Sequence, residues 1–224
     1  MAIDYGFKTF LEFYSGSFVK FLQRSGVLKE VEGVSIIGPL ELTIQERPLR
    51  IDFVILAGQT YIIIEGKSEA DDLTLEDLYT LSIYAIGLAK KKSIPMTEIN
   101  ERILTLVITP TLGNVKCPTS KIGRGIYTIP VPLATYLIVV DELELEPDVL
   151  WLKVLSKEGR RELYRFALKK RQLKILGVLL LIDRDLRLLM MSEEKIVSEA
   201  LRDIGEALGY DKLIRIFFRD EEGL

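Results

Sequence analysis

Three charged residues lie in or directly beyond two neighbouring apolar runs of the kind that form buried strands. They are Asp52, Glu65 and Lys67. A two-residue turn at Gly58-Gln59 would join the runs as a hairpin, since a type II′ turn requires glycine at its first central position. In this register Asp52 lies opposite Glu65, with Cβ atoms about 4.5–5.5 Å apart, and Lys67 shares their face.

Two carboxylates this close cannot both stay ionised without positive charge between them. A divalent cation and Lys67 would supply that charge. The cation would polarise a phosphodiester and help to generate hydroxide, while Lys67 would orient or activate the water or stabilise developing charge. The alternative is a structural salt bridge between Lys67 and either Asp52 or Glu65 at the end of a sheet.

The residue types that the chain lacks limit the possible catalytic mechanisms and metal ligands. The chain has no histidine and one cysteine, Cys117. Mechanisms of the Ser-His-Asp and Cys-His types and zinc sites with histidine ligands are therefore excluded. Oxygen ligands favour Mg²⁺ or Mn²⁺. The net charge of −3 means that any nucleic-acid site must be a local basic patch.

Hydrophobic periodicity predicts an α/β core followed by helices. The predicted helices are 4–14, 18–24 and 75–92, and the predicted strands are 34–37, 40–45, 51–56, 61–64, 103–109 and 136–140. Thr74 and Asp77 form a capping-box-like start to the third helix, and a Gly/Pro-rich connection spans 110–135. We expect a core over 1–140 and a helical C-terminal appendage over 141–224.

The segments Arg50-Ile-Asp-Phe and Ile62-Ile-Ile-Glu-Gly-Lys, followed by a helix after a short acidic loop, resemble the PD-(D/E)xK phosphodiesterase superfamily. The predicted element order is similar to its restriction-endonuclease-like αβββαβ core with a mixed central sheet. The resemblance implies that Lys67 is catalytic. It also implies metal ligation by Asp52, Glu65 and the carbonyl of Gly66.

Within that superfamily the chain is most similar to the Rpn/YhgA-like transposase-nuclease group. The shared features are Asp4-x-x-Phe-Lys in the first helix, the Arg-x-Asp strand, Val107-x-Thr-Pro and a helical tail, over about residues 4–140. Much of that group has Glu-x-Gln where this chain has Glu65-Gly-Lys67. The departure puts the subfamily in doubt and restores the fuller superfamily motif.

Two further residues are candidates for accessory roles. RecB-like members carry Gln-x-x-x-Tyr on the helix after the motif, and here Thr80-Leu-Ser-Ile-Tyr84 stands in that place, without the glutamine. Tyr84 either faces the site or is an ordinary core or surface tyrosine. Glu12 on the first helix either completes the metal shell, as acids do in some relatives, or is merely solvated.

The densest basic segment is 153–174, with nine bases and two acids. It can neutralise several phosphates, or it can be a solvated helix face. The candidate nucleic-acid-binding residues are Arg160, Arg161, Arg165, Lys169 and Lys170. A second candidate patch consists of Lys116, Lys121 and Arg124.

The sequence therefore predicts a magnesium-dependent DNA endonuclease, with DNA as its partner and a homodimer left open. We expect it to be cytoplasmic and without a membrane segment, since the most apolar stretch, 173–191, is interrupted by charges. One alternative is a catalytically silent nuclease fold that binds DNA or protein. Another is a structural protein that oligomerises through its helical tail.

Overall fold

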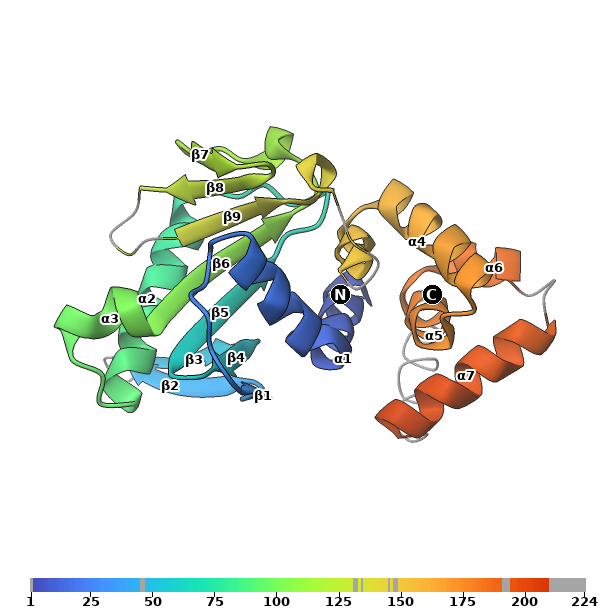
Figure 1. Cartoon of the computed structure of the whole chain (residues 1–224), viewed down its shortest axis with the longest axis horizontal. Coiled ribbons are helices and arrows are strands. Elements are labelled where there is room, and N and C mark those ends of the chain that lie inside the picture. Colours follow the sequence, from blue (N-terminus) through green and yellow to red (C-terminus); the bar gives the residue numbers. More distant parts are fainter. Residues whose placement is uncertain are drawn as a thin grey trace. The chain divides into compact units, whose positions relative to one another are not determined.

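Seven strands form one mixed sheet in the computed structural model, in the order β1-β4-β5-β6-β9-β8-β7 (Figure 1). Strands β5, β6 and β9 run parallel, and every other neighbouring pair is antiparallel. The strands are β1 (Val34–Ile36), β4 (Val54–Ala57), β5 (Thr60–Gly66), β6 (Ile103–Thr109), β7 (Ser120–Gly123), β8 (Ile126–Ile129) and β9 (Thr135–Val139). The expected α/β class with a mixed central sheet is confirmed.

The structure describes residues 2–44, 47–130, 133, 135–144, 146, 149–190 and 194–209. Its chain divides into two units, one of residues 11–149 and one of residues 1–10 with 150–224. The division falls between 149 and 150, where the sequence predicted 140 and 141. Helix α1 (Ala2–Arg24) contributes to both units and departs from helical geometry at Tyr14, the last residue of the first of the two helices predicted here, 4–14 and 18–24.

Helix α2 (Leu75–Lys91) connects β5 to the parallel strand β6, and short helices η1 (Met96–Glu98) and α3 (Ile99–Arg102) follow it. Figure 1 shows α2 behind the sheet and the second half of α1 in front of it. The inner face of α2 packs into the core because its apolar residues recur every three or four positions. These residues are Leu78, Leu81, Ala85 and Leu88.

Two predicted segments differ in the structure. The predicted strand 51–56 is broken at Asp52 and Phe53, because β3 (Arg47–Ile51) pairs with β2 (Leu40–Ile44) in a separate two-stranded sheet. The predicted connection 110–135 contains the hairpin of β7 and β8, which extends the main sheet at its far edge. Strands of only four residues give too short an apolar pattern to be recognised.

The second unit contains η4 (Leu150–Leu155), α4 (Lys157–Lys170), α5 (Leu173–Ile182), α6 (Arg184–Met190) and α7 (Glu194–Leu208). Helix α5 is apolar on all sides and packs against the other three α-helices. Gly177 permits the approach of α7, since a Cβ there would lie 2.8 Å from Cβ of Ile204. No helix within the described ranges is long and apolar enough to cross a membrane.

Candidate metal and phosphate site

The hairpin of β4 and β5 has the predicted register. Ala57 pairs with Thr60 across the turn. Gly58 has φ of +59°, whereas Gln59 is not in the positive-φ region, which is the pattern of a type II′ turn. The prediction that Gly58 forms the turn, and that this turn sets the register of β4 and β5, is therefore confirmed.

Asp52 lies in a bend between β3 and β4, directly beyond the paired residues. The amide of Ile64 donates a 3.3 Å hydrogen bond to the carbonyl of Phe53, so the pairing continues to the residue next to Asp52. The following position on β5 is Glu65. Asp52 is half-exposed, and its carboxylate lies 3.4 Å from the guanidinium of Arg50. The pairing therefore ends one residue short of Asp52 and Glu65, and Asp52 is not itself a strand residue.

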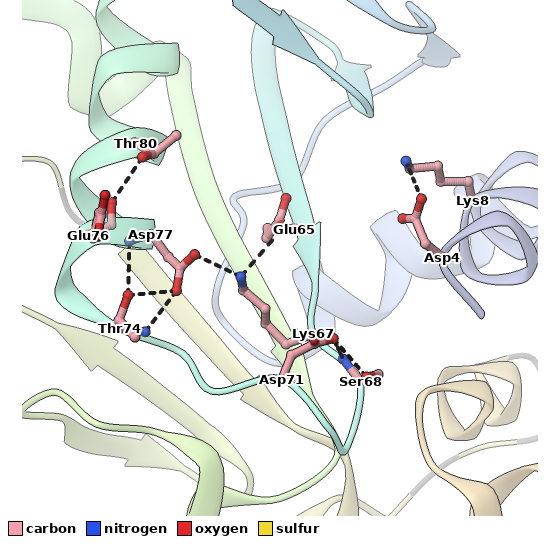
Figure 2. Close-up of polar contacts among 10 residues, drawn as sticks. All are labelled: Asp4, Lys8, Glu65, Lys67, Ser68, Asp71, Thr74, Glu76, Asp77 and Thr80. Atoms are coloured by element: carbon pink, nitrogen blue, oxygen red, sulfur yellow. Dashed lines mark hydrogen bonds and ion pairs between the residues drawn. The ribbon is translucent and has the colours of Figure 1, made fainter. Parts of the chain in front are cut away.

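Lys67 follows the carboxyl end of β5, where its amide donates a 2.8 Å hydrogen bond to the carbonyl of Ile108 on β6. Its side chain is only 14% exposed. Nζ donates to Oδ1 of Asp77 at 2.8 Å and lies 3.8 Å from Oε1 of Glu65 (Figure 2). The lysine therefore lies between two carboxylates, one on the strand and one on α2.

Asp77 is the site residue that the sequence identified only as a helix cap. Its Oδ2 accepts hydrogen bonds from the amide of Thr74 at 2.8 Å and from the hydroxyl of Thr74 at 2.9 Å. The cap therefore leaves Oδ1 for Lys67. The signal was present in the sequence, because a capping carboxylate at the start of the helix after β5 must lie near the end of that strand.

The balance of burial and hydrogen bonding sets the protonation of Asp77. Burial opposes ionisation, but hydrogen bonds from Lys67 and Thr74 outweigh it, so the pKa of Asp77 is lowered. A carboxylate with a depressed pKa contributes stability above its unfolded pKa, about 4, and loses that contribution as the pH falls through the folded pKa. At neutral pH the Asp77 carboxylate is ionised and its contribution is full.

Tyr84 lies on α2 and is half-buried. Burial raises the pKa of its phenol, and the negative charges of Glu65 and Asp52 raise it further. Both carboxylates therefore lie close enough to act on Tyr84. Tyr84 also packs against the hydrophobic core, as an ordinary core tyrosine does.

The donors at this edge fit a hard divalent cation. Asp52, Glu65 and the carbonyl of Gly66 offer only oxygen, and Mg²⁺ commonly takes one or two carboxylates while it keeps several waters. Within the described ranges, no group of three or more His, Cys, Asp or Glu side chains is placed to hold a metal. Glu12 is exposed on α1 and does not complete such a group.

The loops beside Lys67 tie the carboxyl ends of the strands together. Leu73 and Val115 form a bridge, and the side-chain amide of Asn114 donates to the carbonyl of Glu69 at 2.8 Å. Asp71 accepts hydrogen bonds from the amide and hydroxyl of Ser68, as expected of a loop residue. In open α/β sheets, ligands bind outside the carboxyl ends of parallel strands, which is the edge that carries Glu65 and Lys67.

Replacement of Asp77 by alanine should destabilise the fold by about 1–3 kcal/mol, since it removes the cap and leaves Lys67 without its closest partner. Urea unfolding measures the change. Glu30→Ala is the control, because Glu30 is an exposed carboxylate of the same unit and lies outside any helix, and it should cost less than about 0.5 kcal/mol. The difference between wild type and Asp77→Ala should shrink below about pH 4. Equal effects of the two substitutions would contradict a structural role for Asp77.

The basic segment of the second unit is only partly available to a ligand. Arg161, Arg165 and Lys169 recur every four residues and are exposed, so they form one stripe along α4. Lys170 is also exposed, but it lies about 100° around the helix from Lys169, outside this stripe. Arg161 lies 3.4 Å from Glu158.

The prediction that Arg160 binds nucleic acid is wrong, because this residue is buried and paired. Its side chain is 8% exposed, and its Nε donates to Oδ2 of Asp183 at 2.7 Å. One terminal nitrogen donates to the carbonyl of Val154 at 3.0 Å. Arg160 lies on the same helix face as Leu163 and Ala167, which are also buried. A phosphate cannot reach it in this structure.

The second candidate patch pairs its bases with acids. Lys121 donates to Glu142 at 2.7 Å, and Arg124 pairs with Glu144. Lys116 lies 3.9 Å from Asp72. This patch is therefore close to electrically balanced and attracts phosphates less than the α4 stripe.

Comparison with models of protein families, with curated proteins and with solved structures found no match to this chain.

Proposed function

We propose that this protein is a metal-dependent phosphodiesterase of the PD-(D/E)xK type that hydrolyses DNA. One observation carries the proposal. The β4–β5 pairing, with its last hydrogen bond from Ile64 to Phe53, ends one residue short of Asp52 and Glu65, at the sheet edge where Lys67 follows β5. These three residue types, in this order along a hairpin, are the set that the superfamily motif requires.

The order of elements supports the same proposal. When the β2–β3 hairpin is set aside as an insertion, the first unit runs α1, β1, β4, β5, α2 and β6. The strands β1, β4 and β5 are successive antiparallel neighbours, and β6 lies parallel to β5. This arrangement corresponds to an αβββαβ core. The β9, β8 and β7 strands then extend the sheet beyond it.

Each site residue has a distinct role under this proposal. Asp52, Glu65 and the Gly66 carbonyl would hold the cation, and the cation would supply Lewis acidity toward a phosphodiester and toward a water molecule. Lys67 offers a positive charge to a developing negative oxygen. Asp77 fixes the Lys67 side chain through the 2.8 Å contact, since a lysine alone has many rotamers. Tyr84 offers a phenolic proton donor near both carboxylates.

The second candidate function is a catalytically silent fold that binds DNA or protein. The 2.8 Å contact between Lys67 and Asp77 favours this second function, because a lysine paired with a helix-capping aspartate is also typical of a purely structural ion pair. A structural pair requires only Lys67 and Asp77. A phosphodiesterase also requires Asp52 and Glu65 to bind a cation, so metal binding distinguishes the two.

The test combines calorimetry with a cleavage assay on the full chain. Mg²⁺ or Mn²⁺ should bind, and either ion should stimulate cleavage of supercoiled, duplex or single-stranded DNA, with EDTA abolishing it. Glu65→Gln, which keeps the shape of the side chain, should lose both signals. Wild-type protein that binds neither ion and cuts none of these substrates would establish the silent alternative.

The α4 stripe provides a further expectation. Alanine at Arg161, Arg165 and Lys169 should weaken DNA binding about equally across sequences. The slope of log affinity against log salt should become shallower by about 0.9 for each lost duplex phosphate contact. Alanine at Lys121 and Arg124 is the control, since acids already neutralise both. An unchanged slope in the triple variant would make the stripe a solvated face only.

A further inference from the structure

Helix α2 exposes a second apolar stripe on the side away from the core. Four large apolar side chains of this helix are between 43% and 53% exposed. They are Leu75, Tyr79, Ile83 and Ile86. A helix that packs on a sheet by one face usually presents polar residues on the other. The exposed side of α2 therefore has the composition of an interface.

The helical periodicity defines this surface. At 3.6 residues per turn, the four apolar residues fall within an arc of about 100°, and Glu76 and Lys90 fall in the same arc. Glu76 lies at the amino-terminal end of the arc and Lys90 at the carboxy-terminal end, and both are exposed. We call these six residues the outer stripe. It has an apolar middle, an acidic end and a basic end.

We infer that the outer stripe is the dimer interface between two copies of this chain, with the two α2 helices packed antiparallel about a two-fold axis beside Ile83. In that register, each residue lies opposite a residue of the other copy such that the two residue numbers add to about 166. Tyr79 then packs near Ile86 of the partner subunit, and Glu76 lies opposite Lys90 of the partner subunit. The two ion pairs recur by symmetry, as an isologous interface requires.

The arrangement of charges on the outer stripe favours a second copy of this chain as the partner, and it favours antiparallel packing of the two helices. A parallel pair would place Glu76 against its own copy and Lys90 against its own copy, and such like-charge contacts are unfavourable. An antiparallel pair also sets the positive end of each helix macrodipole beside the negative end of the other. The stripe is thus complementary to itself. This makes a second copy the partner that the surface fits.

The interface leaves the candidate site open. Asp77 and Tyr84 lie outside the arc of the outer stripe, and Asp77 is turned to Lys67 (Figure 2). Dimerisation by this face therefore does not depend on phosphodiesterase activity. The inference stands or falls separately from the proposed function.

Sedimentation equilibrium of the full chain over a range of concentrations tests the inference. Wild type should be a dimer. Ile83→Glu, which puts two carboxylates at the two-fold axis, should raise the dimer dissociation constant by about 100-fold or more. Met96→Glu is the matched control, since Met96 is 58% exposed and lies outside the stripe, and it should remain dimeric. Circular dichroism should show that both variants fold.

A charge exchange tests the register. Glu76→Lys should weaken the dimer by about tenfold, and adding Lys90→Glu should restore it, because the pairs are then reversed and not lost. A dimer that persists in Ile83→Glu assembles through another face and overturns the inference. A wild type that remains monomeric also overturns it and leaves the stripe to a different protein.

Discussion

Lys67→Met should reduce the rate of metal-dependent DNA cleavage by about 10²–10³-fold, which is the usual loss when one group that stabilises developing charge is removed. Metal binding should remain, because the proposed ligands of the cation are Asp52 and Glu65. Asp52→Ala and Glu65→Ala should lose metal binding and cleavage together. The three losses should not add in the triple variant, since the residues act as one unit.

Single-turnover cleavage and isothermal calorimetry measure the two properties independently. Lys116→Met is the control, because Lys116 is an exposed lysine in the loop beside Lys67, and its rate should equal that of wild type. A Lys67→Met variant that cleaves at the wild-type rate would assign Lys67 to structure alone. Loss of metal binding in that variant would show that the lysine acts through the site geometry.

Arg160→Met should destabilise the helical unit by about 3–5 kcal/mol, the cost of removing one partner of a buried ion pair. Asp183 is 11% exposed and would keep its charge without the guanidinium. It would still accept the amide of Leu186 at 3.0 Å, but one amide does not replace the positive charge of the guanidinium. Denaturant unfolding followed by tryptophan fluorescence reports the change, since Trp151 lies in the same unit.

Arg161→Met is the control for this experiment, because Arg161 is the exposed neighbour on α4, and it should change stability by less than about 0.5 kcal/mol. Burial opposes ionisation of Asp183, but hydrogen bonds from Arg160 and Leu186 outweigh it and lower its pKa. The effect of Arg160→Met should therefore be full at neutral pH and decline below about pH 4. A small, pH-independent effect would contradict the buried pair.

The hairpin and its register could be predicted because they depend on local rules. Gly58 determines the turn, the turn determines the pairing, and two apolar runs place the strands in the core. The division at Asp52 could not be predicted in this way. Whether β3 joins the main sheet or pairs only with β2 depends on contacts between distant elements, and an apolar run looks the same in both cases.

The wrong assignment of Arg160 and the incomplete assignment of Asp77 have a common physical origin. Arg160 was counted with its basic neighbours, yet it shares a helix face with Leu163 and Ala167, and a charge on a buried face requires a partner. That partner, Asp183, ends the most apolar helix of the chain. The sequence predicts the helix-capping role of Asp77, which uses one carboxylate oxygen. The contact of its other oxygen with Lys67 depends on how the strand and the helix come together. The spacing of residues in the sequence identifies the face of a helix on which each residue lies. Its contact partners on distant elements can be identified only from the folded structure.

The position of Asp52 at the junction of two sheets also bears on how readily an ion binds. Glu65 is carried by a central strand that is hydrogen-bonded on both sides, whereas Asp52 follows β3, which is paired on one side only within the described residues. The backbone around Asp52 should therefore exchange its amide hydrogens faster than β5. Holding both carboxylates on one cation would restrict that backbone, and the lost conformational entropy lowers affinity. DNA that stabilised the bend would remove part of this cost, so substrate and metal would bind more tightly together than either does alone.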